Sequence, residues 1–175
     1  ITNPVIKICD IEAMSAIAKK HDLLLVIDNT FASPWGCQPI KFGADLVIHS
    51  TTKYLGGHSD IVGGAVVGKA DLIAKMFIKK VHFGGSPDPH NCYLLERGIR
   101  TLAARMPIHC ANAAEIAKRL EAHPLIDVVH HPSLSSHRDY ELAKRMIPKG
   151  TGMIAFTVKG GDESALKFMR GLEIV

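Results

Sequence analysis

The sequence predicts an α/β protein, because short apolar runs alternate along the chain with segments whose apolar residues have helical spacing. The clearest apolar run is residues 23–27, where leucine, valine and isoleucine follow one another without interruption. The clearest helical spacing lies in residues 11–18. Loops that contain glycine and proline separate the two kinds of segment.

The first elements follow from these patterns. Asp10 can cap a helix that begins at the next residue, and Lys19 and Lys20 favour the C-terminal end of that helix. The run at 23–27, which polar residues and a proline follow, is typical of a strand buried on both faces. Asp28 stands at the carboxyl end of this strand.

The middle of the chain continues the alternation. Residues 31–43 predict a loop with one helical turn, and a short strand at 46–48 then runs directly into His49–Lys53. After a glycine-rich turn, residues 65–67 predict a third strand and residues 71–81 a helix.

A longer helix is predicted at 88–106, continuing to about residue 123. Pro107 is expected to kink or break it, since proline removes a backbone donor and its ring clashes with the preceding turn. Smaller elements follow, namely strands at 128–129 and 153–158 and helices at 139–146 and 162–169.

We place a domain boundary near residue 105, inside this long helix, which divides the chain into units 1–105 and 106–175. Residues 172–175, apolar except for Glu173, predict the start of a further strand, and the chain begins without methionine. We therefore expect a piece of a longer protein, truncated at both ends.

Composition excludes several classes of function. Hydrophobic residues make up 47% and charged residues 22%, as in ordinary globular proteins. No apolar run reaches the roughly 18 residues that a membrane span needs, and no signal peptide opens the chain, so we expect a cytoplasmic protein. The net charge of +4 is spread along the chain and aromatic residues make up only 6%, which argues against a nucleic-acid groove.

The cysteines and histidines predict neither disulfides nor a metal site. The four cysteines are scattered, so we interpret them as reduced. Neither His49 with His58 nor His90 with Cys92 has a recognised metal-ligand spacing. The chain also lacks the glycine-rich motif of a nucleoside-triphosphate loop.

Chemistry-bearing residues gather at two predicted strand ends, where open α/β sheets bind ligands. Asp28 ends the first strand, and Ser50, Thr52 and Lys53 follow the second, with four glycines shortly after them. In an extended segment the hydroxyls of Ser50 and Thr52 leave the same side and can donate to one phosphate. A phosphate site, an amine and a fixed carboxylate together describe a site for pyridoxal 5′-phosphate (PLP).

The sequence around these residues resembles the Cys/Met-metabolism (trans-sulfuration) PLP enzymes, the group of cystathionine γ-synthase, the cystathionine lyases, methionine γ-lyase and O-acetylhomoserine sulfhydrylase. The matching segments are residues 2–4, 9–11, 26–34, 43–60, 88–90, 94–102 and 131–134. The resemblance spans the whole chain and implies the aspartate-aminotransferase-like fold (fold type I), with units 1–105 and 106–175 as parts of the large and small domains.

The resemblance also implies roles for single residues. Lys53 matches the lysine that forms a Schiff base with PLP, and Asp28 matches the partner of the pyridine nitrogen. Ser50 and Thr52 match the hydroxyls that bind the phosphate. Further cofactor contacts are implied at two positions, Asn3 for the phenolic oxygen and Thr30 for the ring face.

The activity that the resemblance implies is β- or γ-elimination or γ-replacement on a sulfur amino acid, of the cystathionine γ-lyase or γ-synthase type. Residues 57–60 favour the cystathionine enzymes, with methionine γ-lyase and O-acetylhomoserine sulfhydrylase as alternatives. A non-catalytic fragment that keeps the fold is a hypothesis of a different class. Family members form active sites at dimer interfaces and are commonly tetramers, which predicts a homo-oligomer.

Overall fold

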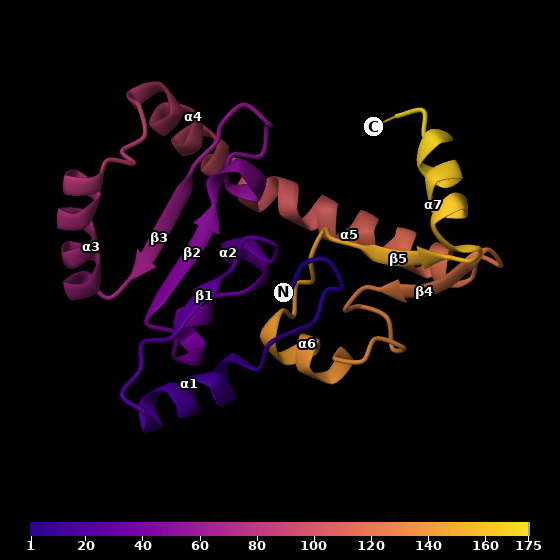
Figure 1. Cartoon of the computed structure of the whole chain (residues 1–175), viewed down its shortest axis with the longest axis horizontal. Helices are drawn as coiled ribbons and strands as arrows, with labels where there is room; N and C mark the ends of the chain where they lie inside the picture. Colours follow the sequence, from indigo (N-terminus) through magenta and orange to yellow (C-terminus); the bar gives the residue numbers. More distant parts are fainter. Residues whose placement is uncertain (175) are drawn as a thin grey trace.

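The computed structural model describes residues 1–174, which form two sheets connected by one long helix (Figure 1). The strands are β1 (Val26–Asp28), β2 (Leu46–Ser50), β3 (Gly64–Gly68), β4 (Ile126–His130) and β5 (Ala155–Val158). The helices are α1 (Ile11–Lys20), α2 (Ser33–Gly36), α3 (Ala70–Phe83), α4 (Pro89–Arg100), α5 (Leu102–Glu121), α6 (Tyr140–Met146) and α7 (Gly161–Arg170). Two tight turns complete the set, η1 (Pro39–Phe42) and the π-helical turn η2 (Thr51–Leu55). The predicted α/β class is confirmed.

The first sheet has the order β1-β2-β3. Strands β1 and β2 are parallel, with Val26 opposite Leu46 and Asp28 opposite Ile48, whereas β3 runs antiparallel to β2. Because β1 and β2 are parallel neighbours, their carboxyl ends meet at one edge, as expected for the two strand ends that carry the polar residues.

The strand predicted at 23–27 is displaced along the chain. Asp45 makes two hydrogen bonds to the backbone of Leu25. Its carboxylate accepts from the Leu25 amide, and its own amide donates to the Leu25 carbonyl. Pairing with β2 therefore begins only at Val26. Leu23 and Leu24 remain 61% and 59% exposed, so the expectation of a strand buried on both faces is wrong for this chain.

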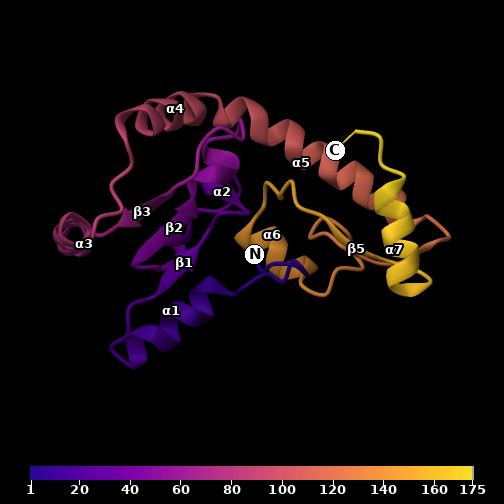
Figure 2. The same ribbon diagram turned by 45° about the horizontal axis from the view of Figure 1, so that its top comes forward.

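The break in the long helix also lies elsewhere than predicted. The helix divides at Thr101, between α4 and α5, while Pro107 stands inside α5. Leu102 and Met106 pack against Leu55, and Met106 is completely buried. This packing offsets the backbone hydrogen bond that Pro107 cannot make. Helix α5 then runs on to the second sheet, where it contacts β4 (Figure 1 and Figure 2).

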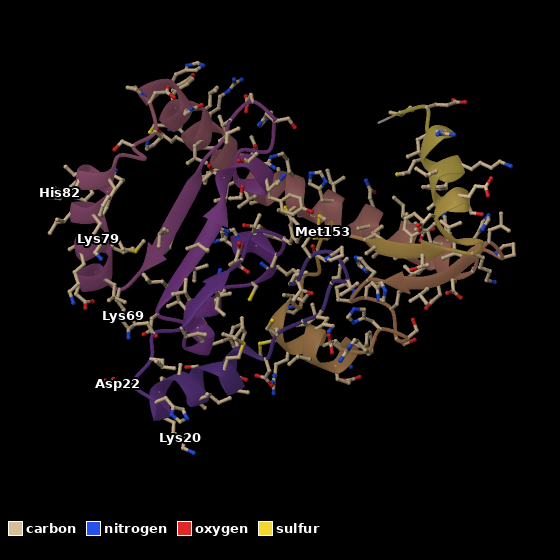
Figure 3. All side chains as sticks on the ribbon, in the orientation of Figure 1. Lys20, Asp22, Lys69, Lys79, His82 and Met153 are labelled. Carbon is tan, nitrogen blue, oxygen red and sulfur yellow. The ribbon has the colours of Figure 1, made fainter. Side chains whose placement is uncertain are left out.

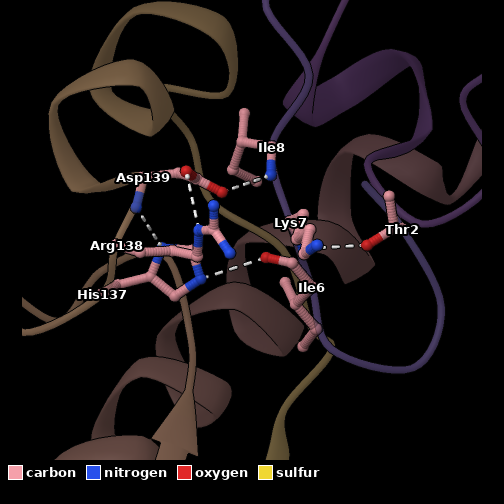
Figure 4. Close-up of polar contacts among 7 residues, drawn as sticks. All are labelled: Thr2, Ile6, Lys7, Ile8, His137, Arg138 and Asp139. Carbon is pink, nitrogen blue, oxygen red and sulfur yellow. Dashed lines mark hydrogen bonds and ion pairs between the residues drawn. The ribbon is translucent and has the colours of Figure 1, made fainter.

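The second sheet packs with α5 in its own buried cluster around Ala117, Val129 and Leu134, while the core of the first sheet extends to α6. One buried cluster joins α1 and the first sheet to Ala143, Met146 and Ile147 at the end of α6. The N-terminal segment is held by the start of α6 (Figure 4). There the Nε2 of His137 donates to the carbonyl of Ile6 at 3.0 Å, and Asp139 accepts from the Ile8 amide at 2.9 Å.

Most other elements agree with the sequence. Asp10 caps α1, its carboxylate accepting from the Ala13 amide, and the short helices and strands of the second half lie at the predicted places. The predicted strand at 172–175 is wrong for residues 172–174, which are not extended into a strand, and Val175 lies outside the described residues.

Charged side chains lie at the periphery, where Figure 3 shows Lys20 on α1 pointing outward, and Lys79 on α3 is likewise exposed. Both belong to the densest basic spots of the sequence, so these spots are solvated helix faces. Among residues 1–174, no helix combines the length and the apolar character that crossing a membrane requires.

Large apolar side chains are nevertheless exposed over the first sheet and α3, which has no buried residue in this chain. Phe77, Val81 and Phe83 are 59%, 62% and 87% exposed. Contiguous apolar surface of this kind drives association. We therefore expect residues 1–175, expressed alone, to be aggregated or molten, with strong light scattering and no cooperative circular-dichroism melt. A monodisperse monomer with a sharp melt would contradict this expectation.

Candidate functional site

The candidate site lies where β1 and β2 end side by side. The amide of Asn29, just after β1, donates to the carbonyl of Ile48 in β2 at 2.9 Å, which holds the two strand ends together. Asp28 and Ser50 both line a cavity of about 620 Å³ between the sheet and α3. The sequence-predicted meeting of these two strand ends is confirmed.

Thr30 connects the two strands. Its amide donates to the Asp28 carboxylate at 2.9 Å, and its hydroxyl oxygen accepts from the Ser50 amide at 2.8 Å. Thr30 thus links the Asp28 carboxylate to the Ser50 amide, through its backbone amide on one side and its hydroxyl on the other. This bridging contact was not foreseen from the sequence, because it joins residues 20 positions apart through a side chain.

The segment after Ser50 is not extended, contrary to the sequence-based expectation. Thr51–Leu55 forms a π-helical turn in which the Gly56 amide donates to the Thr51 carbonyl at 2.9 Å. The hydroxyls of Ser50 and Thr52 are therefore not related by strand alternation. Thr52 instead accepts from the Gly63 amide at 3.2 Å, which leaves its hydroxyl hydrogen free to donate to a ligand.

Lys53 is exposed on this turn and has non-helical backbone angles, φ −95° and ψ −129°. Its carbonyl accepts from the Gly57 amide at 2.8 Å. Gly57 has φ +76°, a left-handed conformation that favours glycine. Lys53 and Thr52 do not line the cavity that Asp28 and Ser50 share, but follow Ser50 directly on the adjoining turn.

Asn3 stands apart from this group. It lies exposed in the turn formed by residues 3–5. Its neighbour Thr2 lines a smaller cavity of about 250 Å³, which Asp28 also lines from the other side of the strand end. The Thr2 hydroxyl oxygen accepts from the Lys7 amide at 2.9 Å, closing the turn (Figure 4).

His49 is a buried titratable residue that directly precedes Ser50 of the site. It is only 6% exposed, and its Nδ1 has no hydrogen-bond partner within residues 1–174. Burial lowers the pKa of His49, and the nearby negative charge of Asp28 opposes part of this effect. At neutral pH the ring is therefore uncharged. No cluster of three potential metal ligands occurs in the described part of the chain.

The polar groups at this edge of the sheet fit the cofactor that the sequence predicts. PLP offers a carbonyl for an amine, a basic ring nitrogen for a carboxylate and a phosphate for hydroxyl donors. The edge of the sheet carries each of these partner groups, with Asp28 at the end of β1, Ser50 at the end of β2, and Thr52 and Lys53 on the next turn.

The chain is similar along its whole length to proteins of known type. It is 43% identical to the L-methionine gamma-lyase of Porphyromonas gingivalis, over 98% of this chain and 44% of the relative. It is 46% identical to a cystathionine beta-lyase of Lactococcus lactis subsp. cremoris, over 95% of this chain and 43% of the relative.

A solved structure has the same fold over this region. It is the cystathionine gamma synthase of Xanthomonas oryzae pv. oryzae in complex with aminoacrylate and cysteine, which matches with a TM-score of 0.95 and 41% identity. The match covers 98% of this chain and 45% of that one. The chain thus spans less than half the length of each of these three relatives. A family model described as Cys/Met metabolism PLP-dependent enzyme matches residues 1–175, and the chain belongs to this family.

Proposed function

We propose that this chain supplies the cofactor-holding part of a PLP-dependent enzyme that acts on a sulfur amino acid by β- or γ-elimination or by γ-replacement, of the cystathionine γ-lyase or γ-synthase type. The observation that carries the proposal is the pairing of β1 with β2, because it brings Asp28 beside the strand that leads into Lys53. The names of the relatives, two lyases and a synthase of sulfur amino acids, support the reaction class.

The wider architecture is proposed on the same basis. Residues 1–105 form part of a fold type I large domain and residues 106–175 part of the small domain, with α5 running through the boundary. The whole protein is a homo-oligomer whose active site is completed by segments outside this chain. Exposed apolar side chains on α3 and the first sheet support the need for further protein on that surface.

Each residue of the site has a defined task in this proposal. Bound PLP supplies an electron sink for the charge that develops at the substrate α-carbon. The Nζ of Lys53 would hold the cofactor covalently, and its amine would serve as the group that moves the proton at the substrate α-carbon. The carboxylate of Asp28 keeps a proton on the ring nitrogen.

Asn3 and Thr30 complete the cofactor contacts in this proposal, at the phenolic oxygen and against the ring face. Thr30 has a second task, for which its bridge between Asp28 and the Ser50 amide is the support. This bridge keeps the groups for the ring nitrogen and for the phosphate at a fixed separation.

Ser50 and Thr52 bind the phosphate through their hydroxyl groups, and each hydrogen bond is worth about 1 kcal/mol or more. We expect the Ser50→Ala/Thr52→Ala variant of the complete protein to bind PLP about 30-fold more weakly, since two such bonds sum to about 2 kcal/mol. Fluorescence titration of the apoprotein with PLP measures this. Ser86→Ala, on an exposed loop, is the control. Unchanged affinity in the double variant would show that the hydroxyls point elsewhere.

Two other substrates remain candidates, because an L-methionine gamma-lyase is among the similar proteins and the family includes O-acetylhomoserine sulfhydrylase. Assays of the complete protein with L-cystathionine, L-methionine and O-acetylhomoserine separate these activities. We expect the highest kcat/KM with L-cystathionine. Turnover of none of the three by a protein that carries PLP would favour a non-catalytic relative.

A further inference from the structure

The junction between α4 and α5 is organised around one guanidinium group. The Nε of Arg105 donates to the hydroxyl oxygen of Thr101 at 3.0 Å. Its Nη2 donates to two carbonyls, those of Gly98 and Tyr54, both at 2.9 Å. Gly98 lies in the last turn of α4 and Thr101 joins the two helices, whereas Tyr54 belongs to the turn that carries Lys53. Arg105 therefore links the helix junction to this turn.

The helix junction and the turn that carries Lys53 pack so closely that neither Gly57 nor Gly98 has room for a Cβ atom. A Cβ atom on Gly57 would overlap the guanidinium of Arg105, and a Cβ atom on Gly98 would overlap the carbonyl oxygen of Gly56. The backbone of the turn is thus enclosed between α4 on one side and Arg105 on the other. Small movements of the guanidinium group are transmitted to the backbone at Gly57, whose amide bonds the carbonyl of Lys53.

Tyr54, the residue directly after Lys53, is held at both its backbone and its side chain. Arg105 binds its carbonyl, and its ring packs against His109 of α5 with the ring centroids 5.7 Å apart. Its hydroxyl lies against Gly152, where an added Cβ atom would come within 2.6 Å. Burial raises the pKa of Tyr54, so the phenol stays neutral. Helix α5 therefore fixes the position of the residue next to Lys53.

The fork shape of arginine is essential to this arrangement. One Nη2 atom reaches two carbonyls while Nε bonds Thr101, which a single ammonium group on a flexible stem cannot reproduce. The Nη1 atom is buried and has no acceptor within the described residues, so the guanidinium group is partly desolvated. Desolvation also lowers the pKa of Arg105.

We infer that Arg105 is a positioning residue for the reaction, which aims the Lys53 amine by fixing the carbonyl of Tyr54 and the backbone at Gly57. This inference rests on the proposed function, because it gives Arg105 no contact with substrate or cofactor. A displacement of about 1 Å at a reacting group costs up to about 100-fold in rate. A looser turn therefore lowers kcat more than it changes KM.

The test compares Arg105→Lys with Arg100→Lys in the complete, PLP-loaded protein. Arg100 is the matched control, since it lies five residues earlier, has a side chain that is 75% exposed and pairs with Glu96 on the surface of α4. Three quantities are measured for each protein: kcat and KM per bound cofactor, the visible circular dichroism of the bound cofactor, and the thermal melt of the apoprotein.

We expect Arg105→Lys to keep PLP on Lys53 but to lose about 10- to 100-fold in kcat, with KM changed less than about threefold. Its visible circular-dichroism band per bound cofactor should also change, because that band reports the orientation of the cofactor. Arg100→Lys should match the wild type in all three measurements.

Two results would overturn the inference. One is an Arg105→Lys variant with wild-type kcat and circular dichroism per bound cofactor. The other is a loss of activity that only follows the fraction of folded protein in the melt. A wild-type protein that carries no PLP on Lys53 would instead refute the proposed function itself, so the two failures are distinguishable.

Discussion

Replacing Lys53 by alanine in the complete protein is expected to abolish the covalent attachment of PLP and with it the yellow colour of the protein. Turnover should fall by at least about 100- to 10,000-fold, the range that a positioned proton donor or acceptor contributes by itself. The physical reason is that Lys53 is the residue of η2 with a side-chain amine, at the exposed position that directly follows Thr52. The visible absorbance spectrum and the steady-state rate measure the two effects.

Lys79→Ala is the control for this variant, because Lys79 is a solvent-facing lysine of α3 (Figure 3). It should keep both colour and activity. A yellow, active Lys53→Ala protein would mean that another amine holds the cofactor.

Asp28→Asn should separate cofactor binding from catalysis. The asparagine can still accept the hydrogen bond from the Thr30 amide, so the local turn is retained and PLP should bind. A neutral amide cannot keep the ring nitrogen protonated, however. An ion pair at about 4 Å and an effective dielectric constant of 20 is worth about 4 kcal/mol, which corresponds to about 1,000-fold in turnover.

The matched control is Asp22→Asn, at an exposed carboxylate of the turn after α1 (Figure 3). It should have wild-type turnover. If Asp28→Asn bound PLP and retained more than about a tenth of the wild-type kcat, the carboxylate would have no such role.

The local elements of this fold were predictable because their causes are local. Asp10 reaches the amide three residues later, and the apolar spacing of α1 continues for a full helix. The pairing of β1 with β2 followed from a general rule for parallel strands and not from any single residue. These features gave the place of the candidate site, at the end of β1 and β2.

The errors have long-range causes. The strand expected at 23–27 is shortened by Asp45, which lies 20 residues away along the chain from Leu25. Helix α5 continues through Pro107 because Leu102 and Met106 pack against Leu55. No sequence window contains both partners of such contacts.

The same limit applies within the site. The segment Ser50–Thr52 was interpreted as extended, whereas Thr51–Leu55 forms a π-helical turn that contacts the distant residues Gly98 and Arg105. Arg105 itself carries no local motif that marks it, since its contact with Tyr54 spans 51 residues. Its importance becomes visible only when α4, α5 and the turn are seen together.

The most direct test of the whole account is borohydride reduction of the complete, PLP-loaded protein, followed by mass spectrometry of its peptides. Reduction makes the link between lysine and cofactor permanent, so the modified residue can be identified. The account predicts one phosphopyridoxyl group per chain, on Lys53. A reduced adduct on a different lysine, or a protein that takes up no adduct at all, would contradict it.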